Sequence, residues 1–455
     1  MKTTLLVAAA ALCLAGCSFI PIYERPAAPV APAFPEPSAS TGPAAAELPW
    51  ADFLADARTR ALVDIALKNN RDLRIAVLNV EQSRAALGVQ RSELLPTLGA
   101  GASAQRTGNN SSYALGLTVS AFELDLFGRV RSLSEAALAR YLASDEGRRA
   151  AQVVLIAAVA STDLAIRADE EQLLLTQRTL ASRQESLRLV RIRFDAGFVA
   201  EQELRGAESL VAAARATLAA LQRQRSQDSN ALALLIGQPL PAELPPPATL
   251  ATLSLADLPA GVPSEVLLQR PDIRQAEQLL IAANANIGAA RAAFFPRITL
   301  TGSAGLASNE LFGLFDNTGW SFTSQLLQPL FDTGRNQANL DAARAGREIA
   351  VAQYEKAIQI AFREVADALA GRATLGEQLA ALQQQAAAET RRLELADLLL
   401  RAGAASLIDR QEVERAALVS QLAVVQAQFA KAQNAVLLYR VLGGGAGPAT
   451  GLSPR

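Results

Sequence analysis

The sequence predicts a mainly α-helical protein with a membrane β-barrel portion, internally duplicated into long coiled-coil helical hairpins with four transmembrane strands per chain. Three observations favour this fold class. Two very long stretches lack proline, four runs of about ten residues alternate between apolar and small or polar residues, and both features recur about 200 residues later. Half of the 455 residues are hydrophobic, so the chain can bury a large core.

The charge balance and the absence of histidine exclude several functional classes. With 43 basic and 44 acidic side chains and few aromatic residues, the chain has no positive surface and few stacking platforms for nucleic acid. Without histidine it cannot assemble a Ser/His/Asp or Cys/His nucleophile system, or the usual histidine-bearing metal site. We therefore expect no enzyme, no metal and no cofactor apart from a covalent lipid, although a paired-carboxylate hydrolase is not formally excluded.

The N-terminus predicts export and lipidation. Lys2 precedes an apolar run from Leu5 to Leu14, so residues 1–16 have the pattern of a signal peptide. Leu14-Ala15-Gly16-Cys17 resembles a bacterial lipobox, which implies cleavage before Cys17, acylation of its sulfur and, with Ser18 next, sorting to the outer membrane. An ordinary signal peptide with an incidental cysteine is the alternative. Residues 17–49 hold eight of the 21 prolines and predict a lipidated, extended arm.

Proline placement divides the rest of the chain, because proline inside a helix costs about 3 kcal/mol. None occurs between Pro96 and Pro239 or between Pro329 and Pro448. The segments expected are a first structural repeat at 50–238, a Pro-rich linker at 239–263, a second repeat at 264–442 and a flexible tail at 443–455. A helix from Arg129 to about Phe194 would be about 100 Å long, which is far too long for a globular core.

Apolar residues in the proline-free stretches recur at the 3,4 spacing of coiled-coil seams. They include Val351, Tyr354, Ile358, Ala361, Val365 and Ala368, and also Leu418, Leu422, Val425 and Phe429. Phe194-Asp195-Ala196-Gly197 and Leu400-Arg401-Ala402-Gly403 interrupt the seams at an offset of 206 residues. Each glycine is therefore expected in the left-handed turn of a helical hairpin.

Four alternating runs predict strands at about 97–106, 113–124, 297–307 and 318–330. Each has one apolar face and one small or polar face, which is typical of transmembrane strands, whereas a soluble antiparallel sheet is the alternative. After the signal peptide no segment reaches 18 uninterrupted apolar residues, so strands rather than a helix are expected to cross the membrane. Four strands cannot close a barrel; a dimer would supply eight strands, and a trimer twelve with room for a lumen.

Several phrases, in order, resemble the outer-membrane efflux lipoproteins of the TolC/NodT type. They are Asn69-Asn70-Arg71-Asp72-Leu73, Phe122-Glu123-Leu124-Asp125-Leu126-Phe127-Gly128-Arg129, and Arg270-Pro271-Asp272-Ile273 with residues 283–296. The resemblance covers Cys17 to about Leu442 and departs from the family pattern at Phe122, where tryptophan is expected. Pro271 and Asp272 also suit simple helix initiation, and Gly128 and Gly334 suit strand-to-helix junctions.

The resemblance implies a homotrimer with a twelve-stranded outer-membrane barrel and a long periplasmic α-barrel. Such a protein is the exit duct of a tripartite efflux system for small molecules, lipid-anchored in the outer membrane and extending into the periplasm. Its partners would be a periplasmic adaptor (membrane fusion) protein, an inner-membrane pump and outer-membrane lipid. The alternative for the whole chain is a periplasmic coiled-coil scaffold or adaptor lipoprotein, which would explain the seams but not four paired strands.

The resemblance also implies two functional locations. The hairpin tips would contact the adaptor, and they comprise Asp195, Ala196, Gly197, Phe198, Arg401, Ala402, Gly403 and Ala404. Close to the tips, Ile408 and Glu412 would line a gate and Arg415 would tie neighbouring helices, although the family more often has Asp in place of Glu412. Three symmetry-related carboxylates would attract cations, whereas a solvated i,i+3 pair is the alternative.

Overall fold

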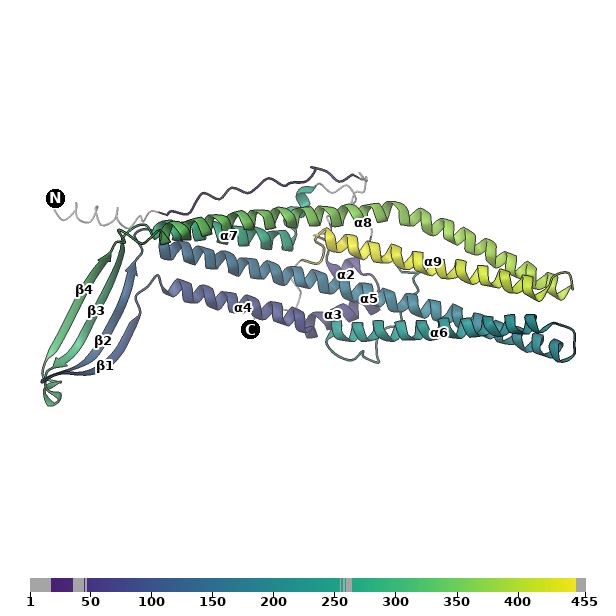
Figure 1. The fold of residues 1–455 in the computed structure, drawn as a ribbon, viewed down its shortest axis with the longest axis horizontal. Coiled ribbons are helices and arrows are strands. Elements are labelled where there is room, and N and C mark those ends of the chain that lie inside the picture. Colours follow the sequence, from purple (N-terminus) through teal and green to yellow (C-terminus); the bar gives the residue numbers. More distant parts are fainter. Residues whose placement is uncertain are drawn as a thin grey trace. The chain divides into compact units, whose positions relative to one another are not determined.

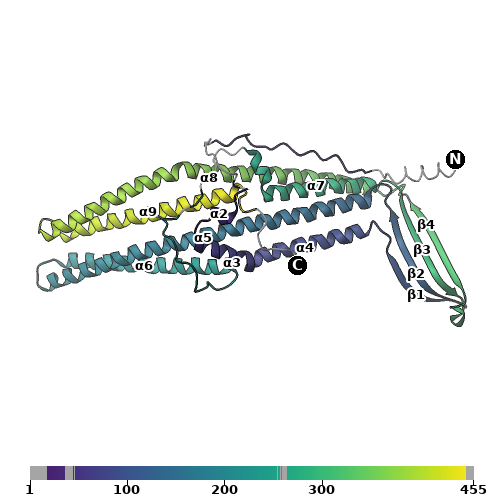
Figure 2. The same cartoon turned by 180° about the vertical axis from the view of Figure 1, so that it is seen from behind.

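A computed structural model describes residues 18–35, 45, 47–253, 255–256, 258 and 264–446, which form two compact units. The first unit comprises residues 18–29 of the predicted arm, residues 76–148 and residues 271–359, and the second comprises residues 30–75, 149–270 and 360–446. Figure 1 and Figure 2 show the chain from opposite sides. The predicted signal peptide, its cleavage site and Cys17 lie outside the described residues, as do residues 447–455.

The first unit contains a four-stranded antiparallel sheet with the order β1-β2-β3-β4. Its strands are β1 (Leu98–Thr107), β2 (Asn110–Leu124), β3 (Arg297–Ser308) and β4 (Thr318–Leu327). Leu117 pairs with Ala100 on one side and with Ala304 on the other, and Ala304 pairs in turn with Trp320. Directly opposed residues share a face, so the alternating apolar positions of all four strands form one apolar face.

A bulge in β2 keeps that face continuous. The apolar positions of β2 are odd-numbered as far as Val119 and even-numbered from Phe122, and the pairing with β3 shifts between these two residues. Ala121 has a positive φ of 48° there, and its N–H donates to the hydroxyl of Thr301. The extra residue returns Phe122 to the apolar face, as bulges do.

Two strand ends differ from the expectation. The polar stretch expected as a loop from residue 107 to 112 mostly continues the ladder, because Thr107 pairs with Asn110 and the turn contains two residues. Gly108 takes the left-handed conformation that such a tight turn requires. At the other end, β4 stops at Leu327 rather than at 330, before Pro329, which has no N–H to donate.

Each hairpin of strands leads into a very long helix through an Asp-x-x-Gly or Asp-x-Gly junction. Helix α5 (Arg129–Asp195) follows Gly128, and α8 (Arg335–Arg401) follows Gly334; both glycines have a positive φ. The Asp125 carboxylate accepts hydrogen bonds from the N–H groups of Val130 and Arg131 in the first turn of α5, and the Asp332 carboxylate accepts one from the N–H of Asn336. The junctions thus cap the helices with negative charge at their positive ends.

Residues 18–29 of the arm lie on helix α7 (Pro271–Ala292), and most of α4 (Arg71–Ser92), which precedes β1, belongs to the same unit. The Phe19 ring stacks on Phe295 with centroids 4.6 Å apart. Further along, Arg25 forms a bidentate ion pair with Glu277 of α7. The described part of the arm is therefore attached to the helix by specific contacts.

The second unit contains two helical hairpins, α5–α6 and α8–α9, whose paired helices lie side by side in both views (Figures 1 and 2). In these hairpins α6 spans Glu201–Ile236 and α9 spans Leu407–Val441. The unit also contains α2 (Trp50–Phe53), α3 (Ala57–Asn69) and η1 (Ser264–Gln269). The stacked rings of Phe53 and Tyr439 join α2 to α9. Most of the Pro-rich linker is described, and it packs against this unit through carbonyls that accept from Arg58, Arg167 and Arg372.

The start of the predicted tail is packed against the second unit. Gly443, Gly444 and Gly445 are buried, and the Gln152 amide of α5 donates to the Gly445 carbonyl over 3.1 Å. Gly444 lies so close to the Tyr439 ring that a Cβ there would collide with it. Glycine suits position 444 because the chain passes this ring at close range, and it suits positions 443 and 445 because both have a positive φ.

Among the described residues, α5 is the helix long and apolar enough to cross a membrane by length and composition alone. More than half of its most apolar stretch is buried within the protein. Such burial is what a packed core helix shows.

Candidate functional site

The two hairpin tips have the same backbone. At the first tip, the Gly197 N–H donates to Phe194 and the Phe198 N–H to Arg193; at the second, Gly403 donates to Leu400 and Ala404 to Leu399. Both glycines are left-handed, with φ of 77° and 71°. These are the paired bonds of a Schellman cap, which ends a helix and reverses the chain.

All eight residues expected at the adaptor-contacting tips are exposed: Asp195, Ala196, Gly197, Phe198, Arg401, Ala402, Gly403 and Ala404. The structure therefore brings each predicted group of four together in one turn. The two tips differ in chemistry, because Phe198 is 79% exposed and its counterpart is Ala404. Contact with an adaptor stays a prediction.

The first turns of α9 present the expected gate residues on one exposed face. Ser406 and Asp409 form a reciprocal capping box that starts the helix. From there, the spacing of Ile408, Glu412 and Arg415 places them on one side, and all three are more than half exposed. We name these three residues the gate face.

Within the chain, the Arg415 guanidinium pairs with Glu412 of its own helix, one of the two bonds being 3.1 Å. That hydrogen bond lowers the pKa of Glu412, so its carboxylate is charged at neutral pH. The pairing is the solvated i,i+3 arrangement that the sequence left as an alternative. A tie from Arg415 to a neighbouring helix in an assembly stays a prediction.

The opposite face of the same turns is buried and was not predicted. Leu407, Arg410 and Glu414 occupy it, and the Arg410 and Glu414 side chains are only 14% and 8% exposed. Arg410 donates to Asp397 of α8 at 2.8 Å, to Glu414 at 2.9 Å and to the Ser182 hydroxyl of α5 at 3.2 Å. The signal that could have found it is spacing, because residues 407, 410, 414 and 417 form a 3,4 seam that two charged residues interrupt.

An apolar cluster next to Arg410 joins the two hairpins. Leu407 of α9 packs with Val190 of α5 and with Leu204 and Ala207 of α6. Partly buried residues complete the cluster: Leu187, Phe194, Val199 and Leu400. The start of α9 is therefore attached to the first hairpin by two side chains, the apolar Leu407 and the charged Arg410.

Comparison with known proteins decides the family. Residues 62–238 and 262–444 match the sequence model of the outer membrane efflux protein family. The chain belongs to this family. Among curated relatives, it is 45% identical to the solvent efflux pump outer membrane protein SrpC of Pseudomonas putida, over 98% of this chain and 99% of the relative. It is 44% identical to the outer membrane protein OprJ of Pseudomonas aeruginosa, over 96% and 94% of the two chains.

Solved structures agree. The open-state outer membrane channel MtrE of Neisseria gonorrhoeae is 43% identical, with a TM-score of 0.89 over 94% of this chain and 99% of that one. The Campylobacter jejuni channel CmeC has a TM-score of 0.87 at 27% identity, over 94% and 95%. The predicted family, the fold class of long helices with a four-stranded sheet, the outer-membrane location and the efflux-channel function are confirmed. A periplasmic scaffold or adaptor is not supported.

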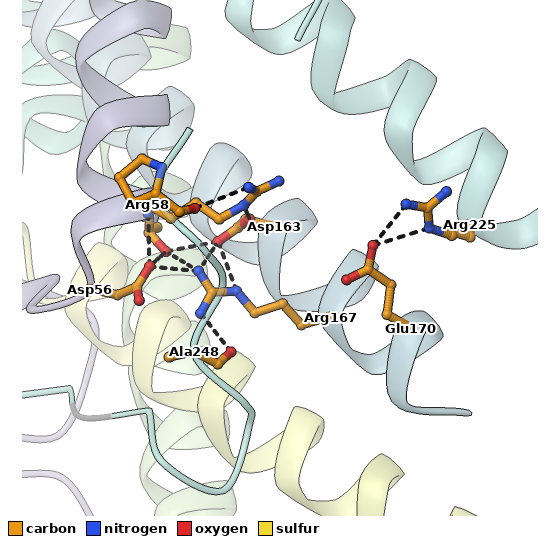
Figure 3. A network of polar contacts seen from close by, with 9 residues as sticks. Asp56, Arg58, Asp163, Arg167, Glu170, Arg225 and Ala248 are labelled. Carbon is orange, nitrogen blue, oxygen red and sulfur yellow. Dashed lines mark hydrogen bonds and ion pairs between the residues drawn. The ribbon is translucent and has the colours of Figure 1, made fainter. Parts of the chain in front are cut away.

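The efflux channel anchors its first hairpin with a buried ionic network (Figure 3). The Arg167 guanidinium of α5 contacts the carboxylates of Asp56 and Asp163 at 2.6 Å each and donates to the linker carbonyl of Ala248. Burial acts to raise the pKa of Asp56, but hydrogen bonds from Arg167 and Thr59 outweigh it and hold the pKa at about 2. The network therefore ties the N-terminus of α3, helix α5 and the linker together with full charges.

The Arg270-Pro271-Asp272 phrase of the channel combines helix initiation with a helix cap. Pro271 is the first residue of α7, as simple initiation requires. The buried Arg270 guanidinium also donates to the Val441 carbonyl at the end of α9 and pairs with Glu364 of α8. An arginine at a helix C-terminus satisfies its free carbonyls and its negative end, a role that helix initiation alone did not predict.

The first hairpin also contains a pair of interacting carboxyl groups. Asp169 of α5 is buried and shares a hydrogen bond with the half-buried Asp228 of α6. Burial, that hydrogen bond and the Asp228 charge raise the pKa of Asp169 to about 7, against a smaller opposing effect of Arg225. No group of three or more His, Cys, Asp or Glu side chains in the described part of the chain could hold a metal ion.

Proposed function

We propose that the channel is a homotrimer that exports small organic molecules as the outer-membrane duct of a tripartite pump. The observation that carries this proposal is the open four-stranded sheet. Strands β1 and β4 are its edges, and β4 is exposed along its whole length. An open edge is not tolerated in hydrocarbon, where each free N–H and C=O costs several kcal/mol, so the strands need further copies of the chain to close.

Three copies supply twelve strands, enough to enclose a lumen, whereas two copies would supply eight and a filled interior. The face opposite the apolar one carries small residues, among them Gly101, Gly116, Ser303 and Gly305. Small side chains on the inner face leave width for a solute. This supports a trimer over a dimer.

The chemistry of the cargo follows from the relatives. SrpC is named for solvent efflux and TtgI for toluene efflux, both from Pseudomonas putida. These names support small organic compounds as the exported class. The exposed tips support contact with a periplasmic adaptor, which would link the duct to an inner-membrane pump.

The gate is proposed at the gate face. Ile408, Glu412 and Arg415 share one exposed side of α9 close to the tip. In a trimer they would line the axis as an apolar ring followed by a ring of three carboxylates, which attracts cations. Cys17 is proposed as the acylated first residue of the mature protein, and intact mass spectrometry should show a lipid adduct on it.

The test combines mass and conductance. Detergent-extracted protein should have the mass of three chains, and a conducting monomer or dimer would contradict the assembly. In planar bilayers, Glu412→Gln/Arg415→Ala should raise single-channel conductance and lower cation selectivity at equal trimer yield. The matched control is Glu185→Gln/Arg188→Ala, an equally exposed i,i+3 pair of α5. Wild-type conductance and selectivity in the first variant would place the gate elsewhere.

A further inference from the structure

The gate face and the buried face of α9 belong to the same two helical turns. Ile408 and Glu412 face solvent, and Leu407 and Arg410 face the protein. A short helical segment moves as a rigid body, because its backbone hydrogen bonds fix each residue relative to the next. Whatever holds the buried face therefore also fixes the position of the gate face.

Arg410 holds the buried face to both hairpins at once. Its planar guanidinium donates to Asp397 on α8 and to Ser182 on α5, while its other contact, Glu414, is on α9 itself. These donors have a fixed fork geometry that lysine does not reproduce. We name Arg410 with Asp397, Glu414 and Ser182 the latch.

The charge of the latch makes it sensitive to the loss of Arg410. Asp397 and Glu414 each form their ion pair with Arg410 in the described structure. Without the guanidinium, two carboxylates would face the same space, one of them nine-tenths buried. Removing one partner of a buried ion pair leaves an uncompensated charge, so the unlatched arrangement would drive the helices apart.

We propose that Arg410 is a positioning residue of the channel, which fixes the position of the gate face by fastening the start of α9 to α5 and α8. The inference rests on the proposed gate. It adds that the gate face is held in place from within each chain by a buried arginine. Within the chain, the exposed Glu412 and Arg415 pair with each other on α9 and would line the pore.

The first experiment measures single-channel conductance and amide hydrogen exchange of purified trimers. Arg410→Gln should raise the conductance several-fold and speed exchange in residues 407–415. The conductance and exchange rate of Arg410→Lys should lie between those of wild type and Arg410→Gln, because lysine keeps the positive charge but not the planar fork of donors. Ser182→Ala should show a smaller effect of the same sign, and it tests the latch even if the arginine variants assemble poorly.

Arg188→Gln is the control. It makes the same chemical change in an exposed pair of α5 and should leave both measurements unchanged. Wild-type conductance in Arg410→Gln would overturn the latch, whether or not exchange increased. If the same bilayers showed altered conductance for Glu412→Gln/Arg415→Ala, the gate would stand without the latch; if neither variant differed from wild type, the gate itself would be wrongly placed.

A reversible cross-link tests the mechanism directly. The sequence has cysteines only at positions 13 and 17, so Ser182→Cys/Arg410→Cys would introduce the only free thiols if Cys17 is acylated. The variant should conduct more than wild type, and a short bis-methanethiosulfonate reagent should return it to the wild-type level until a reductant is added. If cross-linking left the conductance of this variant unchanged, the latch would be contradicted.

Discussion

The two helical hairpins have the same turn geometry, but corresponding residues in them carry different charges. At an offset of 206 residues, Glu208 corresponds to Glu414, whereas Arg191 corresponds to Asp397. In the first hairpin the opposite charges pair directly at 2.9 Å, and Arg191 is well exposed. In the second hairpin the corresponding residues are two carboxylates, and Arg410 bridges them from a buried position.

This difference shows which parts of the two repeats are alike and which differ. The Schellman turn depends on one left-handed glycine, and both copies keep it. Side chains on the helices are free to change, and replacing one partner of a surface pair costs little. Because Asp397 and Glu414 are both acidic, the second hairpin depends on a third residue, Arg410, which pairs with both of them and has no equivalent in the first hairpin.

Farther from the tips, the two hairpins also differ in the ionisable side chains at corresponding positions. The carboxyl pair Asp169 and Asp228 of the first hairpin corresponds to Leu375 and Asn434 of the second. Asn434 donates to the Ala368 carbonyl, a contact that does not depend on pH. We therefore expect a titratable contact between α5 and α6 and none at the corresponding place between α8 and α9.

The largest effect is expected at the buried arginines remote from the two tips. Arg167→Met would remove the cation that Asp56 and Asp163 share, leaving Asp163 with Arg58 at 3.5 Å, and should cost about 3 kcal/mol. Arg270→Met should cost less, because its partner Glu364 is a quarter exposed and also lies near Arg440. Thermal unfolding of detergent-solubilised trimers, followed by circular dichroism, would rank the two; equal losses would mean that the hairpins are anchored alike.

The next effect is pH dependence, confined to the first hairpin. The folded pKa of Asp169 is about 7, above its ordinary value of 3.8, so between these values the folded protein binds a proton that the unfolded chain does not. Stability should then fall as pH rises through this window, by up to about 1.4 kcal/mol per unit, and level off above it. The charge of Arg225 lowers the pKa of Asp169 and the charge of Glu170 raises it, so both residues affect the pH range over which stability falls.

Asp169→Asn should remove that slope, because the amide donates to Asp228 at every pH. Unfolding midpoints measured from pH 5 to 8 would show it, with Asp195→Asn at the exposed tip as the control. A slope that persists in Asp169→Asn would assign the titration to another group.

The long helices, their turns and the strands could be predicted because their causes are local. Proline spacing bounds α5 and α8, and Gly197 and Gly403 interrupt the seams at the places where the chain turns. Even the bulge has a local trace, since the apolar alternation changes phase between Val119 and Phe122. Periodicity carries this information because it follows from backbone geometry.

The latch could not be predicted in the same way. Five charged residues lie between positions 409 and 415, and composition alone does not say which of them is buried. Arg410 finds Ser182 across 228 residues of chain, a contact that depends on how the two hairpins pack. The sequence therefore directed attention to the exposed gate face, while the buried contact opposite it became visible only in three dimensions.

The smallest effect is expected at two exposed ion pairs whose acid and base occur in opposite order in the two hairpins. Glu185 pairs with Arg188 in α5, and at the same offset Arg391 pairs with Glu394 in α8; every side chain is more than half exposed. An acid placed N-terminal to its base suits the helix dipole, so the first order is slightly favoured over the second. Exchanging the charges as Glu185→Arg/Arg188→Glu should therefore lower the melting temperature, and Arg391→Glu/Glu394→Arg should raise it. Each change should be about 1 °C or less and should disappear in 1 M salt, because solvent screens exposed charges. Equal signs for both exchanges, or shifts that persist in salt, would show that these pairs are packed against something in the assembly and that the two hairpins differ at their surfaces as well as at the latch.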